Sequence, residues 1–261
     1  MRYPPLQGVV FDAYGTLFDV YSIAALAESL FPGKGAQIAR QWRTSQVDYT
    51  RLRTLSGRYE PFSKVTRDAL RHACATCGVT LNREREAMLM GAYDRLIAFD
   101  DARPAIERLR ALGLPIGILS NGDPPMLDSA IEAAGLRGLI DHPLSVDVVR
   151  RFKTAPEAYA LGPAAFGCAA SSLLFVSSNG WDVCAAAWYG YRTLWINRGH
   201  LALDELGVRP DREGRSLDEV VRFANELLRP AEPGGPQSGP QAADPGPRGS
   251  RSPSDTSNDQ P

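Results

Sequence analysis

Residues 9–20, VVFDAYGTLFDV, place a single carboxylate at the end of a short apolar run and just ahead of a glycine. Asp12 follows the run directly, and Gly15 comes three residues later. A short apolar run that ends at turn residues is typical of a buried β-strand. A carboxylate at a strand end can be a nucleophile, a metal ligand or a helix cap, and this stretch alone leaves all three roles open.

Four more apolar runs follow along the chain, and helix-period segments separate them. The runs cover residues 6–11 (the first), 115–120, 142–147, 173–178 and 191–196. The helical segments cover residues 101–112, 124–135, 155–167 and 181–190. Buried runs that alternate with helices indicate a parallel sheet with helices on both faces. The sequence therefore predicts an α/β fold.

Residues 20–99 interrupt the alternation, because they read as helix after helix without a strand-like run. An insertion after the first strand would lie over the carboxyl ends of the strands, where open α/β sheets bind ligands. We therefore predict a core of residues 1–19 and 100–230 and a helical cap of residues 20–99. Residues 231–261 are rich in Pro, Gly and Ser and hold no Val, Ile, Leu, Met or aromatic residue, which predicts a disordered tail.

Composition narrows the class of protein further. The 261 residues carry a formal net charge of −1, so the chain has no broad basic field for nucleic acid. It has neither a signal-peptide pattern nor a run of about 18 apolar residues, so we expect a soluble, cytoplasmic protein without a membrane partner. Cys74 and Cys77 form a lone C-x-x-C in a helical segment, and we interpret them as packing thiols.

Polar residues gather where the predicted strands end. They are Asp12 after the first run, Ser120 and Asn121 after the second, and Ser177, Ser178, Asn179 and Asp182 after the fourth, while the third run leads to Lys153. Parallel strands end at one edge of the sheet, so these side chains are expected in one crevice. Taken singly, Ser120 or Asp182 could cap a helix and Lys153 could be a surface lysine. Asp12 has no following helix to cap.

Four motifs resemble those of the haloacid dehalogenase superfamily, and specifically its L-2-haloacid dehalogenase (type II) branch. They are FDAYGTLFD (11–19), LSNG (119–122), FKTAPEAY (152–159) and FVSSNGWD (175–182). The likeness spans about residues 6–230 and includes the cap segment QWRTSQVDYTRLRTLSGRY (41–59). The resemblance implies a Rossmann-like core with an inserted helical cap, and commonly a homodimer.

Two features of the motifs favour a dehalogenase over a phosphatase of the same superfamily. The phosphatases carry a second Asp two residues after the nucleophile, and this acid protonates the departing alkoxide; here that position is Tyr14. Chloride or bromide leaves without a proton, so Tyr14 is compatible with dehalogenation. Ser177 and Ser178 stand where a magnesium-binding version carries acidic residues, so we expect no metal and no cofactor.

The resemblance also implies a reaction. Asp12 would attack C2 of an (S)-2-haloalkanoate and invert it, and water would then hydrolyse the ester to the (R)-2-hydroxyacid. Lys153 would keep Asp12 ionised, and Asp182 would pair with Lys153 and orient the water. The other implied catalytic residues are Ser177, Asn179 and Thr16.

The remaining implied residues bind substrate or halide. Arg43, Asn121 and Trp181 would bind the halide. Trp181 suits this role because the edge of an aromatic ring is electropositive. Ser120 would bind the carboxylate. Val47, Phe62 and Trp181 would form the wall of the alkyl pocket. Tyr14 would add hydrogen bonds near Asp12, and Tyr159 matches a further active-site tyrosine.

Two positions depart from the usual pattern and leave the preferred haloacid open. Thr154 follows the lysine where many relatives have proline, and Thr44 follows Arg43 where glutamine is common. Three rival functions also stay open at this point. They are hydrolysis of another small C2-electrophilic carboxylic acid on the same scaffold, a magnesium-dependent phosphatase, and a binding module for small anions without catalysis.

Overall fold

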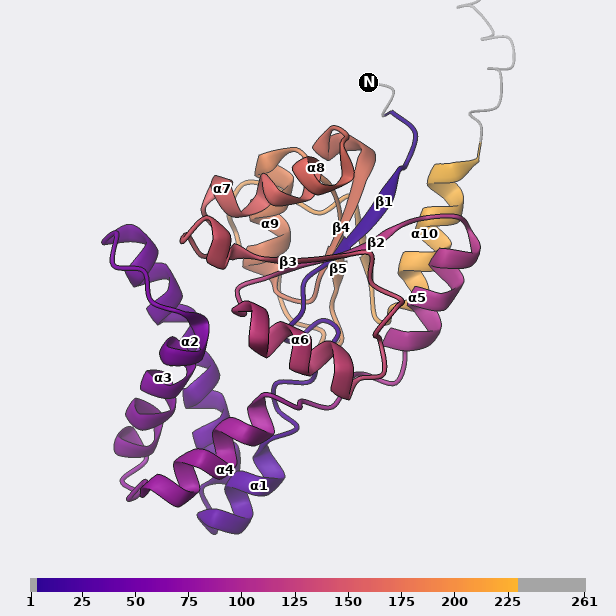
Figure 1. Ribbon diagram of the computed structural model, residues 1–261. Coiled ribbons are helices and arrows are strands. Elements are labelled where there is room, and N and C mark those ends of the chain that lie inside the picture. The colour runs from indigo at the N-terminus through magenta and orange to yellow at the C-terminus, as the bar shows by residue number, and fades with distance from the viewer. Residues whose placement is uncertain (1–3, 230–261) are drawn as a thin grey trace, which may run out of the picture. The chain divides into compact units, whose positions relative to one another are not determined.

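The computed structural model of the protein describes residues 4–229 (Figure 1), so the predicted tail of residues 231–261 lies outside the described part of the chain. The described residues contain a six-stranded sheet of order β3-β2-β1-β4-β5-β6. All five neighbouring pairs of strands are parallel. The strands are β1 (Gly8–Phe11), β2 (Ile116–Ser120), β3 (His142–Ser145), β4 (Leu173–Ser177), β5 (Arg192–Ile196) and β6 (Arg212–Gly214). The predicted α/β fold is confirmed.

Strand β1 lies in the middle of the sheet between β2 and β4. All four of its residues are buried, in keeping with an apolar strand that is covered on both faces. Val10 is in register with Gly117 of β2 and Phe175 of β4, so the three strands end at the same edge. This register places Asp12 between the polar residues that follow β2 and β4.

Helices cover both faces of the sheet. Figure 1 shows α7 (Pro156–Tyr159), α8 (Leu161–Phe166) and α9 (Gly180–Tyr189) together on one face. The helices α5 (Ala102–Ala111), α6 (Pro124–Ala133) and α10 (Asp218–Leu228) lie on the other. In residues 4–229, no helix is long and apolar enough to cross a membrane.

Four helices stand between β1 and α5, and we refer to them as the cap. They are α1 (Ala24–Leu30), α2 (Gly35–Leu55), α3 (Phe62–Thr76) and α4 (Arg83–Tyr93). The two chain segments that lead into and out of the cap run side by side. The Asp19 N–H donates to the Ile97 carbonyl at 2.8 Å, and the Phe99 N–H donates to the Leu17 carbonyl at 2.9 Å.

Three details differ from the sequence prediction. The expected helix 155–167 is interrupted at Ala160, because Pro163 has no N–H for the Tyr159 carbonyl, which instead accepts the Tyr191 hydroxyl at 2.6 Å. The third strand ends at Ser145 rather than at residue 147, because the Ser145 hydroxyl accepts the Asp147 N–H and begins a 3₁₀ turn. The prediction also lacked β6 and α10.

Candidate active site

The nucleophile candidate Asp12 lies where β1 ends and the chain turns. Its N–H donates to the Val176 carbonyl at 2.8 Å, which extends the pairing of β1 with β4, and only 6% of Asp12 is exposed. Gly15 adopts a φ of 95°, a left-handed conformation that favours glycine. The turn brings Thr16 back toward the strand end, where its hydroxyl donates to Oδ2 of Asp12 at 2.8 Å.

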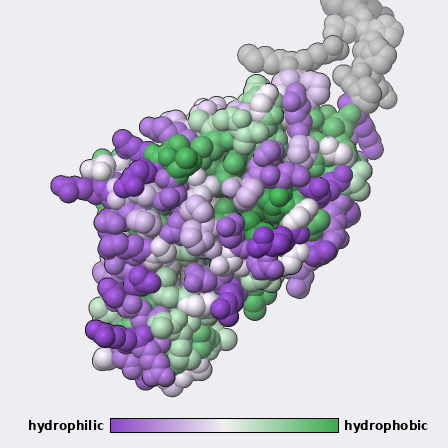
Figure 2. All heavy atoms as spheres, viewed as in Figure 1, coloured by the Kyte–Doolittle hydropathy of each residue, from purple (hydrophilic) through white to green (hydrophobic). Residues whose placement is uncertain are grey.

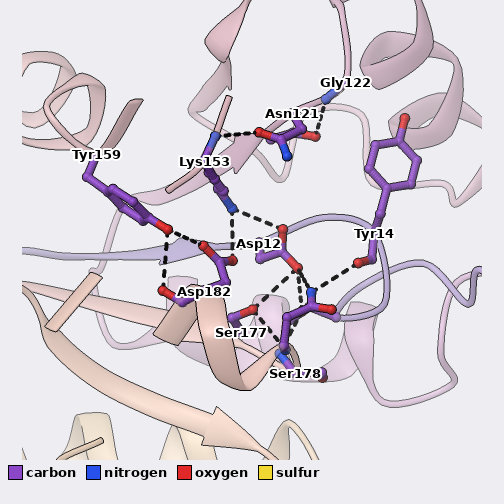
Figure 3. Close-up of polar contacts among 12 residues, drawn as sticks. Asp12, Tyr14, Asn121, Gly122, Lys153, Tyr159, Ser177, Ser178 and Asp182 are labelled. Carbon is purple, nitrogen blue, oxygen red and sulfur yellow. Dashed lines mark hydrogen bonds and ion pairs between the residues drawn. The ribbon is translucent and has the colours of Figure 1, made fainter. Parts of the chain in front are cut away.

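Lys153 joins the two buried carboxylates of the site. Its Nζ lies 3.0 Å from Oδ1 of Asp12 and 3.0 Å from Oδ2 of Asp182 (Figure 3). The Lys153 N–H donates to Oδ1 of Asn121 at 2.9 Å, which fixes the loop that carries the lysine. Burial lowers the pKa of Lys153, but the charges of Asp12 and Asp182 and the hydrogen bonds to them outweigh burial and raise its pKa above the ordinary value. The side chain is therefore an ammonium ion at neutral pH.

Asp182 lies in the first turn of α9 and is fully buried. The Lys153 ammonium contacts both it and Asp12. The Tyr159 hydroxyl donates to Oδ1 of Asp182 at 2.6 Å. Burial, followed by the charge of Asp182, raises the pKa of Tyr159 well above its ordinary value, so Tyr159 remains a hydrogen-bond donor. Burial also raises the pKa of Asp182, although Lys153 opposes this change. Tyr159 thus contacts Asp182, and it does not line the substrate cavity described below.

The two oxygens of Asp12 have different environments. Among the described residues, Oδ1 accepts a hydrogen bond from Lys153 alone. Oδ2 accepts from Thr16 at 2.8 Å, from Nδ2 of Asn179 at 2.8 Å and from the Ser177 hydroxyl at 3.4 Å. Oδ2 is therefore saturated with donors, whereas Oδ1 keeps a lone pair that can react.

Arg43 reaches the site from the cap helix α2. Its guanidinium donates to the Tyr14 carbonyl at 3.1 Å and to Oδ1 of Asn179 at 3.2 Å. It also donates to Oε1 of Gln46 at 3.0 Å. The Tyr93 hydroxyl donates to the same amide oxygen at 3.0 Å, so Gln46 is itself held in place. These contacts attach a positive charge from the cap to the loop that follows β1.

A small cavity opens beside Asp12 between the cap and the core. The residues that line it are Asp12, Tyr14, Arg43, Val47, Thr50, Phe62, Asn121 and Trp181. The structure thus brings together the residues that the sequence assigned to the halide cradle and the alkyl wall. Ser120 is not among the lining residues; it is buried at the end of β2, and its hydroxyl accepts the Gly122 N–H at 2.9 Å.

The Tyr14 side chain does not lie as the sequence suggested. Its ring points away from the Asp12 carboxylate (Figure 3) and packs against Phe62 and Tyr93, with ring centroids 5.5 and 5.6 Å away. Within residues 4–229, its buried hydroxyl has no hydrogen-bond partner. Only the Tyr14 carbonyl joins the polar network, accepting from Arg43 and Asn179. The expected hydrogen bonding therefore comes from the backbone, because the turn at Gly15 directs the ring toward the cap.

Sequence reasoning missed two residues on α2. Gln46 holds Arg43, and Thr50 lines the cavity. Both lie on the helix face of Arg43, at i+3 and i+7, and Val47 lies at i+4. Helical spacing from Arg43 is the signal that could have identified them.

The donor set does not fit a magnesium ion. The Lys153 ammonium lies between the Asp12 and Asp182 carboxylates and contacts one oxygen of each at 3.0 Å. The other oxygens of these carboxylates accept hydrogen bonds from Thr16, Asn179 and Tyr159. No group of three or more His, Cys, Asp or Glu side chains in the described chain could hold a metal ion. Magnesium prefers several oxygen ligands with negative charge, and here the Lys153 ammonium already contacts both carboxylates and offsets part of their charge.

Comparison with known proteins agrees with the site. The family model of the haloacid dehalogenase-like hydrolases matches residues 6–190 of the sequence. The (S)-2-haloacid dehalogenase of Pseudomonas sp. (strain YL) is 42% identical over 229 residues, which cover 88% of this chain and 99% of that protein. The crystal structure of the L-2-haloacid dehalogenase RSc1362 is 53% identical, covers 85% of this chain and 100% of its own, and has a TM-score of 0.84.

A third relative was solved with a covalently bound haloacid. The L-2-haloacid dehalogenase of Xanthobacter autotrophicus, solved with chloropropionic acid covalently bound, is 36% identical with a TM-score of 0.79, and the match covers 84% of this chain and 98% of that one. The chain belongs to the haloacid dehalogenase-like hydrolases, and within them to the family of the L-2-haloacid dehalogenases. The family resemblance that the sequence motifs suggested is confirmed.

Proposed function

We propose that the protein hydrolyses (S)-2-haloalkanoic acids to (R)-2-hydroxyalkanoic acids, with inversion, through an ester on Asp12. The observation that carries the proposal is the asymmetry of Asp12: among residues 4–229, Oδ1 accepts a hydrogen bond from the Lys153 ammonium alone, and Oδ2 accepts three donors. This carboxylate borders a cavity that also contains the Arg43 cation. The names of the relatives support the substrate class.

In the first step Oδ1 of Asp12 attacks C2 of the substrate. The new C–O bond forms as the carbon–halogen bond breaks, and the electron pair of that bond leaves with the halide. Arg43 and Asn121 line the cavity and are suited to bind the halide anion, and Trp181 borders the same space. No proton is needed for halide departure, which is consistent with a Tyr14 hydroxyl that lies away from the reacting atoms.

In the second step water attacks the carbonyl carbon of the Asp12 ester. Oδ2 then carries the developing negative charge, and Thr16, Asn179 and Ser177 already donate toward this atom. Preorganised donors at such an oxygen stabilise the tetrahedral intermediate. One proton of this water passes, by way of the Lys153 ammonium that contacts both carboxylates, to Asp182, whose raised pKa suits it to accept a proton. Collapse of the intermediate breaks the bond between the ester oxygen and the Asp12 carbonyl carbon, and the departing alkoxide takes this proton back from Asp182 by the same route. The second water proton leaves to solvent, so that the hydroxyacid is released and Asp12 is restored as a carboxylate.

The magnesium phosphatase alternative lacks support from the geometry. An alkoxide leaving group needs a proton donor next to the nucleophile, and the group at that position is the Tyr14 ring, which faces Phe62 and Tyr93. The space between the Asp12 and Asp182 carboxylates is occupied by Nζ of Lys153, 3.0 Å from one oxygen of each. Hydrolysis of another small C2-electrophilic acid would use the same Asp12 chemistry and differs only in the leaving group.

The activity is tested by incubating the protein with (S)- and with (R)-2-chloropropanoate and measuring free chloride. We expect chloride from the (S) enantiomer, undiminished by EDTA, and none from Asp12→Asn. Asp19→Asn, an exchange on the same loop outside the cavity lining, is the matched control and should keep the activity. Chloride release from neither enantiomer would refute the proposal, and loss of activity in EDTA would restore a metal mechanism.

Two structural proposals accompany this function. We propose that residues 20–99 form the cap domain and residues 1–19 and 100–230 the core domain, supported by the four helices between β1 and α5.

We also propose a homodimer, supported by the family resemblance. Light scattering on the purified protein tests the dimer, and the mass of a single chain at all concentrations would contradict it.

A further inference from the structure

A second, larger cleft lies at the C-terminal end of α2, between the cap and the loop that leads to Lys153. It has a volume of about 650 Å³ and does not share a lining residue with the active-site cavity. Its lining residues are Arg53, Thr54, Gly57, Arg58, Tyr59, Glu60, Arg150 and Arg151. Figure 2 shows hydrophilic residues gathered at the end of the α2–α3 pair nearest α7. Four of the eight lining residues are arginines.

Three of these arginines have no carboxylate partner. Within residues 4–229, no ion pair joins Arg58, Arg150 or Arg151 to an acidic side chain, whereas Arg53 lies 3.5 Å from Asp68. Glu60 is the one acidic residue of the lining. The cleft therefore holds an excess of positive charge on a chain whose net charge is −1. Positive charges gathered around one cleft repel one another, and a bound anion would offset this repulsion.

Neighbouring contacts fix the directions of two of these arginines. The Arg150 guanidinium lies over the Tyr59 ring, 5.0 Å from its centroid, and the Tyr59 hydroxyl donates to Asp147 at 2.6 Å. The Arg151 guanidinium donates to the Thr54 carbonyl at 3.0 Å. Each contact uses part of the guanidinium and leaves other N–H donors available. Arginines held in this way lose less side-chain entropy when they bind a ligand.

We propose that this cleft binds a small phosphate-bearing anion, which bridges Arg58 of the cap to Arg150 and Arg151 of the core. A guanidinium matches the tetrahedral oxygens of phosphate with two parallel hydrogen bonds. Three unpaired arginines offset by Glu60 leave two positive charges, which a dianion balances. The volume lies within the range of small-ligand pockets and exceeds what a haloalkanoate needs.

The position of the cleft connects it to the rest of the molecule. Arg151 is two residues before Lys153, and the intervening Phe152 packs against Tyr59 at 4.9 Å and against Phe62 at 6.2 Å between ring centroids. Phe62 lines the active-site cavity. An anion that joins Arg58 to Arg150 would therefore stabilise the contact between cap and core near the catalytic loop. Binding should raise the unfolding temperature.

The experiment is a calorimetric titration of the full chain, at constant ionic strength, with inorganic pyrophosphate, glycerol phosphate and succinate in turn. Thermal unfolding is measured in parallel with pyrophosphate, glycerol phosphate and succinate. The variant is Arg58→Gln/Arg150→Gln, and the control is Arg40→Gln, an exposed arginine on the cap helix α2 that lies outside the cleft. Glycerol phosphate and pyrophosphate distinguish an organic phosphate ester from a free inorganic anion.

We expect saturable binding of pyrophosphate or glycerol phosphate by the wild type and by Arg40→Gln, and about tenfold or greater weakening in Arg58→Gln/Arg150→Gln. Absence of saturable heat with the wild type overturns the proposal, whether or not the double variant folds. Equal affinity in the double variant assigns the anion to another place and also overturns it. Tighter binding of succinate than of either phosphate overturns the assignment to phosphate.

Discussion

The Nζ atom of Lys153 lies 3.0 Å from Oδ1 of Asp12, and both side chains are buried. The same Nζ lies 3.0 Å from Oδ2 of Asp182, so one ammonium joins two carboxylates that lie far apart in the sequence. Buried charges are stable only when they are paired. This bridge therefore serves the fold as well as the proposed chemistry, because it holds an ammonium ion against Oδ1 of Asp12 beside the cavity.

Removing the ammonium should destabilise the protein strongly. Lys153→Met leaves two buried carboxylates without their cation, and we expect a loss of about 3–5 kcal/mol in the free energy of unfolding along with loss of chloride release. Lys64→Met removes an exposed lysine that pairs with Asp68, and should cost about 1 kcal/mol or less. Urea unfolding of both variants gives the comparison. Similar losses in the two would contradict the role assigned to the bridge.

The pH dependence should reflect the raised pKa of Lys153. Because the pKa is higher in the folded protein, the stabilisation is fully present below the unfolded value of about 10.4 and is lost as the pH rises through the folded value. We expect kcat for chloride release to persist at least to about pH 10.4. Halide release is followed from pH 7 upward against a blank without protein. A fall in kcat that is caused by deprotonation of Lys153 and has its midpoint below about pH 10.4 would show that the pKa of Lys153 is not raised.

Tyr159→Phe removes the donor to Asp182 without changing the size of the ring. Oδ1 of Asp182 then loses its 2.6 Å hydrogen bond in a buried place, which should cost about 1–3 kcal/mol of unfolding free energy. We also expect kcat to fall with little change in KM, since Tyr159 is a positioning residue outside the cavity lining. Tyr189→Phe is the control, because within the described chain its hydroxyl has no hydrogen bond. Unchanged kcat in Tyr159→Phe would exclude the positioning role.

Two glycines should respond in opposite directions to alanine. A Cβ on Gly122 would lie 2.9 Å from the Tyr14 ring and 3.2 Å from the Ser120 hydroxyl, so Gly122→Ala should cost about 1–3 kcal/mol of unfolding free energy. Gly91 is in α4, and a Cβ there meets nothing within 4 Å. Gly91→Ala should therefore stabilise by about 0.5–1 kcal/mol. Thermal unfolding measures both, and a tolerated Gly122→Ala would mean that the Tyr14 ring can move.

Much of the sheet could be predicted because apolar runs define buried strands. Strand β6 could not be predicted, because Arg212–Gly214 has no apolar residue and the strand forms through its pairing with β5. Pro163 is a local signal for the break at Ala160, but the hydroxyl that satisfies the freed Tyr159 carbonyl belongs to Tyr191, in a distant part of the chain. Such elements are set by tertiary contacts that local sequence patterns do not contain.

The site divides in the same way. Asp12, Lys153 and Asp182 were predicted to meet because parallel strands end at one edge of the sheet. The order of the elements along the chain is enough to predict this. The packing of the cap on the core is not encoded in that order. The direction of the Tyr14 ring and the support of Arg43 by Gln46 therefore became visible only in the structure.

The central claim is that Asp12 forms a covalent ester which water then hydrolyses. A single turnover in heavy-oxygen water, with the protein in excess over (S)-2-chloropropanoate, tests it by mass spectrometry of the Asp12 peptide and of the hydroxyacid. We predict that the heavy oxygen appears in Asp12 and that the product of this first turnover carries none. Heavy oxygen in the product and an unlabelled Asp12 would mean direct attack by water and would contradict the account.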